Sequence, residues 1–294
     1  MPHYKTLRKA AAILFLAGAL SFTACTQEPG DAPAAETQYQ SNEETDEMQN
    51  DSDLQLLDGT MLEYLRDNQI TLLQLQPLVP GEELAILHTN KGDITLRFFP
   101  DEAPKAVENF KTHARNGFYD GLIFHRVIPG FMIQGGCPLG TGTGGTSIWG
   151  EGFSTEPSFN VRHFNGALAM AHAGSGTIGS QFYIVQNYTL DSRTIAEFED
   201  ILAHQDEAIG RFSDGTRVTL GDFFPAAELE HYLANGGTPH LDWHRNPQGG
   251  HPVFGHVVDG MDVVNAIANT PQGASNRPLD DMIIERISFV KYGE

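Results

Sequence analysis

Cysteine and basic residues are scarce in this sequence, and each shortage excludes a class of protein. The 294 residues include two cysteines, Cys25 and Cys137, which are too few for a disulfide scaffold or a cysteine-rich zinc site. Lysine and arginine number 18 against 38 acidic residues, so the formal net charge is −20. Because binding to nucleic acid or an anionic membrane surface depends on Lys and Arg, this balance argues against either as the main partner. No segment reaches the roughly 20 apolar residues of a transmembrane helix.

The first 24 residues have the pattern of a signal peptide. A basic start precedes an apolar run over residues 10–20, which suits secretion and is too short to span a bilayer. Residues 22–25, Phe-Thr-Ala-Cys, resemble the lipobox of bacterial lipoproteins, in which the cysteine is lipid-modified and becomes the first residue of the mature chain. Phe22 replaces the usual Leu, so ordinary signal cleavage is the alternative. We expect a bacterial protein anchored through Cys25 on the extracytoplasmic face of the cell membrane.

Residues 25–83 are predicted to form an acidic, flexible tether with a possible short helix. No basic residue lies between Lys9 and Arg66, and the segment up to about residue 53 has little apolar surface to offset chain entropy. Residues 54–75 contain enough Leu, Ile and Met for a short helix or two before the prolines that follow. The tether would act as a spacer between the anchor and the folded part.

Residues 84–294 are predicted to form one mainly β domain. Two alternating segments with a turn at residues 90–92 indicate a hairpin, and short apolar runs separated by glycines follow. Helices are expected over about residues 104–116, between a proline and a glycine, and over about 261–268. Many short strands with two helices predict a closed antiparallel β-barrel flanked by two helices.

Between about residues 188 and 238 the pattern changes to helical spacing. Apolar residues from Ile195 to Ile209 recur at this spacing, and Pro225 opens a second helical stretch that stops at Gly236. We expect an inserted helical segment that packs against the barrel, because two short helices are not stable alone.

The densest group of informative residues is the sequence FHRVIPGFMIQGG at residues 124–136. In an alternating strand, Arg126 and a few apolar and amide side chains can face one groove while their neighbours face the core. At this point the sequence resembles the cyclophilin family of peptidyl-prolyl cis/trans isomerases. The resemblance covers about residues 84–294, apart from the insertion. It continues through GTGG at 142–145, AMAHA at 169–173, GSQFYI at 179–184 and HPVFG at 251–255.

The resemblance implies a reaction that needs no nucleophile, metal or cofactor. The barrier to rotation about a peptide bond is about 18–20 kcal/mol, and X–Pro bonds isomerise unaided over tens to hundreds of seconds. No covalent bond breaks, so the catalyst needs only to bind the twisted bond better than either planar isomer. A guanidinium at the prolyl nitrogen can donate to the lone pair as that pair localises. The expected activity is that of a rotamase on proline-containing clients, namely exported or unfolded proteins.

The resemblance also implies roles for individual residues. Arg126 would be the catalytic donor, and Gln134 would hold this arginine and the substrate backbone. The walls of the pocket for the proline ring would be Phe131, Met132, Tyr183 and Leu241. The substrate groove and its rim would be lined by Ala171, His172, Gln181 and His251.

The chain departs from the family at several positions. Tyr183 stands where many members have Phe; its added hydroxyl can point to solvent, so we expect only a modest change in activity. His172 replaces the usual groove Asn. His240 stands where the cyclosporin-sensitive eukaryotic members have Trp, so the loss of the indole should weaken cyclosporin binding. Residues 243–248 are extra relative to the short turn that usually precedes His251.

Other functions fit the sequence less well. Gly140, Gly142 and Gly145 have the spacing G-x-G-x-x-G, but no strand-to-helix crossover follows, so we expect no nucleotide site. His240 and His244 are four residues apart, yet the local Pro and Gly content argues against a helix that would hold them, and we expect no metal. The main rival is a non-catalytic module that binds proline-containing segments in the same groove. A solute-binding lipoprotein would share only the anchor.

Overall fold

The computed structural model describes residues 63–65, 68–172, 177–245 and 250–294. Within them the chain forms two compact units: the larger contains residues 59–206 and 220–294, and the described part of the smaller is residues 207–219. The predicted signal peptide, Cys25 and the first part of the predicted tether lie outside the described residues. Among the described residues, no helix combines the length and apolar character needed to cross a bilayer.

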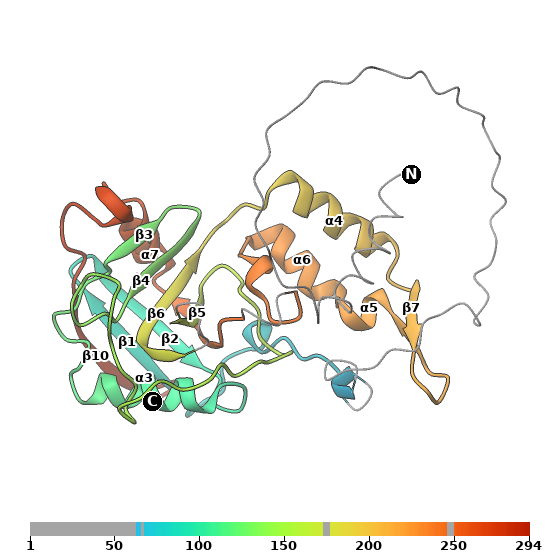
Figure 1. The fold of residues 1–294 in the computed structure, drawn as a ribbon, viewed down its shortest axis with the longest axis horizontal. Helices are drawn as coiled ribbons and strands as arrows, with labels where there is room; N and C mark the ends of the chain where they lie inside the picture. Colours follow the sequence, from blue (N-terminus) through green and yellow to red (C-terminus); the bar gives the residue numbers. More distant parts are fainter. Residues whose placement is uncertain (1–62, 66–67, 173–176, 246–249) are drawn as a thin grey trace, which may run out of the picture. The chain divides into compact units, whose positions relative to one another are not determined.

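An eight-stranded antiparallel sheet forms the centre of the larger unit (Figure 1). Its strands are β1 (Glu83–Thr89), β2 (Gly92–Phe98), β3 (Arg126–Ile128), β4 (Phe131–Gly135), β5 (Ala167–His172), β6 (Ile178–Gln186), β9 (Val253–Asp259) and β10 (Ile284–Lys291). Their order is β10-β1-β2-β9-β5-β6-β4-β3. β1 and β2 form the predicted hairpin, in which Thr89 pairs with Gly92.

The sheet curls into a half-barrel and does not close, so the prediction of a closed barrel is wrong. Its edge strands are β3 and β10. In the described part of the chain, one isolated bridge, between Ile123 and Ile283, joins the segments just before these strands. The backbone nitrogen of Ile284 also donates to the oxygen of Leu122 at 2.8 Å. The contacts between the two edges therefore come from the residues before β3, and β3 itself, which has three residues, pairs only with β4.

The two helices predicted to flank the sheet are present, as α3 (Pro104–Arg115) and α7 (Met261–Ala268). They lie at opposite ends of the curled sheet (Figure 1). Pro104 occupies the start of α3, where its missing N–H group costs nothing. Gly117, with a φ of 69°, follows the end of this helix and adopts a conformation that other residues rarely take. Local sequence signals therefore determine both ends of α3.

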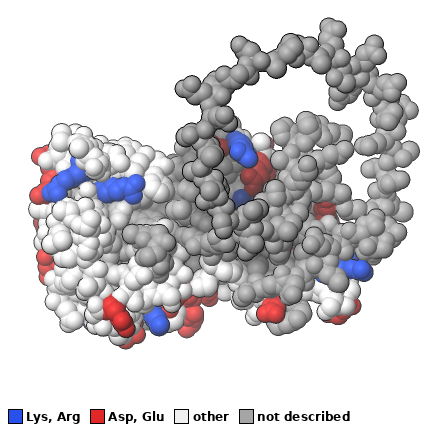
Figure 2. Space-filling view, viewed as in Figure 1, with Lys and Arg blue, Asp and Glu red and all other residues white. Residues whose placement is uncertain are grey.

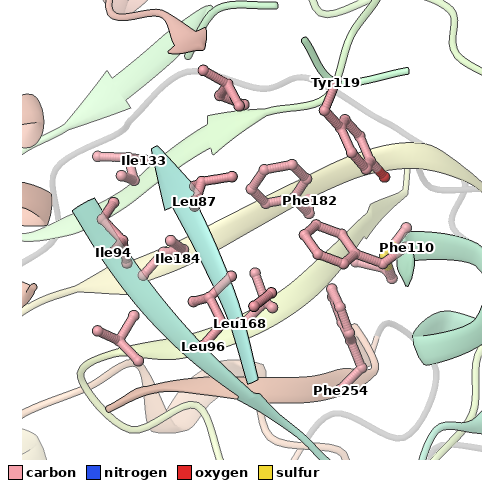
Figure 3. Packing of buried hydrophobic residues seen from close by; sticks show 14 of the residues in the cluster. Leu87, Ile94, Leu96, Phe110, Tyr119, Ile133, Leu168, Phe182, Ile184 and Phe254 are labelled. Carbon is pink, nitrogen blue, oxygen red and sulfur yellow. The ribbon is translucent and has the colours of Figure 1, made fainter. Parts of the chain in front are cut away.

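The main core lies on the inner face of the sheet, beneath α3 and α7. Phe182 of β6 meets Phe110 of α3 and Tyr119 edge-on, with ring centroids 5.2 and 5.5 Å apart (Figure 3). Such pairs contribute about 0.5–1.5 kcal/mol each beyond the burial of their area. Because side chains alternate along a strand, residues between the core positions point to the opposite face of the sheet.

The predicted insertion contains helices in the larger unit and a hairpin in the smaller one. The helices are α4 (Ser192–Ala203), α5 (Leu220–Phe223) and α6 (Ala226–Asn235), and the hairpin strands are β7 (Ala208–Arg211) and β8 (Arg217–Thr219). Ile209, which the spacing assigned to the first helix, lies in β7 instead. The helix ends at Ala203, and a turn at Asp214 and Gly215 pairs β7 with β8, so strand pairing overrides the helical spacing of this residue.

The helices of the insertion pack against the sheet domain, as expected. The ring of Tyr232 in α6 lies 5.8 Å from that of Phe198 in α4 and 4.6 Å from that of Phe164, centroid to centroid. Phe164 itself forms a bridge with Gly237, two residues after the end of α6. The helices therefore bury their apolar faces on each other and on the segment before β5.

The last part of the predicted tether belongs to the folded unit. The backbone nitrogen of Leu73, in the short helix η2 (Leu73–Leu75), donates to the oxygen of Asn160 at 2.9 Å. The amide of Gln74 makes two hydrogen bonds with the backbone of Arg162, of 2.6 and 2.8 Å. Tyr64 already contacts Asn160 through its hydroxyl and packs its ring 4.6 Å from that of Phe159, so a free spacer can extend only to about residue 63.

Charged side chains are dispersed over the part of the described surface that Figure 2 shows. On the face drawn in Figure 2, Lys and Arg form small separate patches among acidic and uncharged residues. The described part of this face therefore offers no continuous basic surface to a phosphate backbone.

Candidate active site

Three neighbouring strands, β3, β4 and β6, place the predicted catalytic residues on the face of the sheet opposite the main core. In β6, Phe182 and Ile184 belong to that core, and Tyr183 between them belongs to a second cluster. The strand register pairs Tyr183 with Gln134 of β4, and Gln134 with Arg126 of β3. Because directly paired residues share a face, Arg126, Gln134 and Tyr183 lie in a row across it.

A chain of hydrogen bonds holds the two predicted catalytic residues. Nη1 of Arg126 donates to Oε1 of Gln134 at 3.4 Å, and Nε2 of Gln134 donates to Oε1 of Gln181 at 3.0 Å. Among the described residues, Gln134 is the one hydrogen-bond partner of this guanidinium. The remaining N–H groups of Arg126 are therefore available to a substrate.

The glycine-rich loop after β4 holds the other end of this chain. Nε2 of Gln181 donates to the carbonyl oxygens of Gly142 and Gly144, at 3.0 and 2.9 Å. Both glycines have positive φ angles, 83° and 91°, which residues with a Cβ rarely adopt. The glycines of this motif therefore serve to aim carbonyl groups at Gln181.

The apolar site residues form the second cluster, which is separate from the main core. The exposed fractions of Met132 and Tyr183 are 2% and 4%, whereas Phe131, Ala171 and Leu241 are half-buried. Met132 and Tyr183 therefore lie at the base of the cluster, and the half-buried residues form its accessible part. The structure thus brings together the four residues expected around a proline ring, with the groove residue Ala171 beside them.

The two groove histidines lie against each other beside this cluster. The rings of His172 and His251 stack with centroids 4.1 Å apart, and Tyr183 meets His251 edge-on at 5.4 Å. Burial lowers the pKa of His251 to about 4, aided by His172. The ring is therefore neutral at pH 7, and its Nδ1 donates to the oxygen of Met170 at 3.1 Å. His251 can pack against a substrate but carries no charge to offer it.

The hydroxyl of Tyr183 points into the protein, which corrects the expectation that it faces solvent. It lies 3.0 Å from Nε2 of His163, a buried residue. Nδ1 of His163 lies 3.0 Å from Oδ1 of Asp242, and the hydroxyl of Tyr232 donates to Oδ2 of Asp242 at 2.6 Å. Because a carboxylate only accepts, Nδ1 of His163 is the donor to it. The contact between Nε2 of His163 and the hydroxyl of Tyr183 completes a chain of bonds from Tyr183 to Tyr232.

Sequence reasoning did not identify His163, Asp242 and Tyr232 as residues near the site. Asp242 directly follows the predicted pocket residue Leu241, which is the one local signal that points to it. His163 and Tyr232 lie outside every motif of the resemblance, and only the packing of α6 brings them to the pocket.

A second buried polar group adjoins this chain of bonds. Nη2 of Arg162 lies 2.8 Å from Oε2 of Glu228, and Nε2 of His244 lies 3.3 Å from Oε1 of the same carboxylate. Burial would raise the pKa of Glu228, but the charges of Arg162 and His244 hold it below its ordinary value. Glu228, Asp242 and His244 are close enough to ligate a metal ion. Arg162 already supplies a positive charge to this group, which disfavours a cation there.

The sequence matches the family model described as cyclophilin type peptidyl-prolyl cis-trans isomerase/CLD, over residues 84–220 and 222–289. The chain belongs to this family. The matched ranges include most of the segment 188–238, whose helices lie outside the eight-stranded sheet.

Relatives and solved structures agree with the cyclophilin assignment. The chain is 43% identical over 207 residues to a protein of Staphylococcus aureus (strain USA300) whose assigned name is that of a peptidyl-prolyl cis-trans isomerase, covering 70% of this chain and 91% of the relative. A Staphylococcus saprophyticus protein with the same assigned name is 42% identical over 219 residues, covering 74% and 98%. The crystal structure of a Cryptosporidium parvum cyclophilin-type isomerase superposes with a TM-score of 0.51 at 28% identity, covering 71% of this chain and 98% of that one. This chain is thus a cyclophilin-type peptidyl-prolyl cis-trans isomerase.

Proposed function

We propose that this isomerase accelerates rotation about X–Pro bonds of exported or unfolded polypeptides, with Arg126 as the donor that stabilises the twisted amide. The observation that supports the proposal most is the position of Arg126. It is tied to Gln134 and lies on the same sheet face as an apolar cluster that includes Phe131 and Leu241. A guanidinium with free N–H groups beside an apolar pocket suits an amide next to a proline ring.

In the proposed mechanism, the apolar cluster holds the proline ring and Arg126 stabilises the twisted amide. Burial of the ring against Phe131 and Leu241 anchors the proline while the amide beside it rotates. As conjugation is lost, the prolyl nitrogen regains its lone pair, and a hydrogen bond from Arg126 becomes stronger there than in either planar isomer. Each 1.4 kcal/mol gained in this way raises the rate about tenfold. Gln134 acts by holding the guanidinium in position.

A crystal structure of the Cryptosporidium parvum protein was obtained in the presence of the dipeptide Ala-Pro. That ligand contains the bond type on which the proposed reaction acts. Its use with a relative of the same fold supports a site that accepts a proline and the residue before it.

The proposal is tested by a proline-isomerisation assay on an Ala-Pro peptide with the full-length protein. We expect Arg126→Ala to lower kcat/KM at least tenfold while the thermal transition is retained, because the donor to the prolyl nitrogen is gone. The matched control is Arg286→Ala, which removes an exposed arginine from β10 and should leave the rate unchanged. If the wild type binds the peptide without accelerating it, the chain is the non-catalytic binding module instead.

We further propose that the mature protein is a lipoprotein, anchored through Cys25 on the extracytoplasmic side of a bacterial membrane. The support is the signal pattern of residues 1–24 and the lipobox-like sequence. Secreted chains fold there without ATP, and an isomerase needs none. Mass spectrometry of the mature N-terminus tests this proposal, and an unmodified Cys25 contradicts it.

A further inference from the structure

A groove lies beside the candidate proline pocket, at the start of the inserted helices. Its lining includes Gly130 from the turn before β4, Asp191, Thr194 and Glu197 from the start of α4, and His240 and Arg245 from the segment after α6. Its volume is about 1330 Å³, which includes space open to solvent. Nothing in the assigned reaction accounts for this groove.

One pair of rings separates this groove from the pocket. Phe131 and His240 stack with centroids 6.3 Å apart and an interplanar angle of 23°. Gly130 and His240 line the groove, and the residues that directly follow them, Phe131 and Leu241, belong to the apolar cluster. A client whose proline ring rests on Phe131 and Leu241 therefore has neighbouring residues within reach of the groove.

The groove carries one unpaired negative charge. Nη1 of Arg245 lies 2.9 Å from Oε1 of Glu197, so these two charges compensate each other. The guanidinium of Arg245 is also stacked over Phe198 and Phe224, at 4.9 and 4.8 Å from their ring centroids. These contacts hold the guanidinium of Arg245 against the wall of the groove, so it does not neutralise the charge of Asp191. Asp191 is the carboxylate left without a cationic partner among the described residues of the groove.

Asp191 is held in place and ionised. As the N-cap of α4, its Oδ1 accepts from the backbone nitrogens of Arg193 and Thr194 at 3.0 Å, and its Oδ2 accepts from the hydroxyl of Thr194 at 2.6 Å. The bonds from Thr194 contribute most to the lowering of its pKa. The side chain is exposed, and Oδ2, which accepts one hydrogen bond, has a further lone pair for a partner.

The charge of Asp191 affects the pKa of His240 across the groove. Burial and His163 lower the pKa of His240, while Asp242 and Asp191 act to raise it. His240 is one of the two rings between the groove and the pocket, so a cation held at Asp191 would lie near a proline bound at Phe131.

We propose that this groove is a second client subsite, which binds a lysine or arginine side chain of the client a few residues from the proline. The occupant is the same polypeptide whose proline enters the pocket, because the groove continues the pocket across the Phe131–His240 pair. The inference rests on the proposed function. It gives the inserted helices a role in the choice of client.

The test measures kcat/KM for Ala-Pro peptides that carry Lys, Gln or Glu at one of four positions on either side of the bond. We expect at least one position at which the Lys peptide reacts about two- to fivefold faster than the Glu peptide, the effect of one exposed ion pair. Asp191→Asn should remove this preference, because it removes the charge but keeps a good N-cap residue. Glu197→Gln should weaken it, because Arg245 would then be unpaired.

The matched control is Asp101→Asn, at an exposed carboxylate outside the groove, which should keep the full Lys preference. The neutral Gln peptide reports any general loss of activity in each variant. Equal rates for Lys, Gln and Glu peptides at every position overturn the subsite and leave the isomerase mechanism standing. A preference that survives in Asp191→Asn also overturns it. A full-length protein that accelerates none of the peptides overturns the proposed function and the subsite together.

Discussion

The hydroxyl of Tyr183 lies 3.0 Å from Nε2 of His163, inside the protein and behind the candidate proline pocket. His163 in turn contacts Asp242, and Asp242 accepts from Tyr232 of α6. A wall residue of the pocket is thereby connected to an inserted helix through groups that are all buried. The tyrosine at this position is therefore part of a polar chain and not merely a larger phenylalanine.

Removal of the Tyr183 hydroxyl should destabilise the protein. In Tyr183→Phe, Nε2 of the buried His163 loses its partner, and an unsatisfied buried polar group costs about 1–3 kcal/mol. We expect a loss of this size in the free energy of unfolding by urea. Tyr188→Phe is the control, because Tyr188 is exposed, and its effect should stay within about 0.5 kcal/mol. Equal stability of Tyr183→Phe and wild type would show that the bond contributes nothing.

The two ends of the chain of bonds should be energetically coupled. Tyr183→Phe and Tyr232→Phe each remove one hydroxyl from the chain through His163 and Asp242. Because the groups share partners, we expect an interaction free energy of about 0.5–3 kcal/mol in a double-mutant cycle on unfolding. Strict additivity of the two variants would contradict the view that α6 supports the pocket.

The ion pair between Arg162 and Glu228 should be costly to break from one side. Both side chains have an exposed fraction of 0%, so Arg162→Met leaves a buried carboxylate with His244 as its nearest described basic group. The expected loss in unfolding free energy is about 3–5 kcal/mol. The double variant Arg162→Met with Glu228→Leu removes both charges and should recover most of that loss. If the double variant is no more stable than the single one, the uncompensated charge is not the cause.

The residues that could be predicted from the sequence lie in short continuous motifs. Arg126, Gln134 and Gln181 were placed on one face by strand alternation and by the resemblance, and the register confirms that they are neighbours. Local patterns suffice here because a strand fixes the direction of every second side chain.

The parts that could not be predicted depend on contacts between distant segments. The hydroxyl of Tyr183 turns inward because His163, 20 residues earlier, is held by Asp242, 79 residues further along. The prediction of a closed barrel was wrong for a similar reason. Closure would require β3 to pair with β10, the strand at the other edge of the sheet. Ile209 fitted a helical spacing, but its strand partner lies after a turn that the spacing does not include.

Acidification should destabilise the protein before the carboxylates titrate. The pKa values of His125 and His251 are lowered to about 4, mainly by burial, and for His125 also by Arg126 and Arg277. In the unfolded chain both titrate near 6.5, so the unfolded state binds more protons between about pH 6.5 and 4. Stability therefore falls as pH falls through this window, by up to about 2 kcal/mol for each residue. Urea unfolding at pH 7 and 4.5 measures the loss.

The matched variants for this pH dependence are His125→Gln and His251→Gln. Each should make the difference in unfolding free energy between pH 7 and pH 4.5 smaller than in wild type, because the substituted side chain does not titrate. An unaltered pH dependence in both buried-site variants would show that these histidines are not protonated on unfolding.

Cyclosporin should inhibit this isomerase weakly, because the sequence resemblance places His240 where the sensitive cyclophilins have tryptophan. The ring of His240 stacks on Phe131 at 6.3 Å, so it forms part of the rim, but it offers less apolar area than an indole and lacks its fixed N–H donor. His240→Trp should lower the inhibition constant about tenfold, which corresponds to 1.4 kcal/mol of added contact. His240→Phe separates the two causes, since it restores apolar area without the donor. Submicromolar inhibition of the wild type would contradict the assignment of this position.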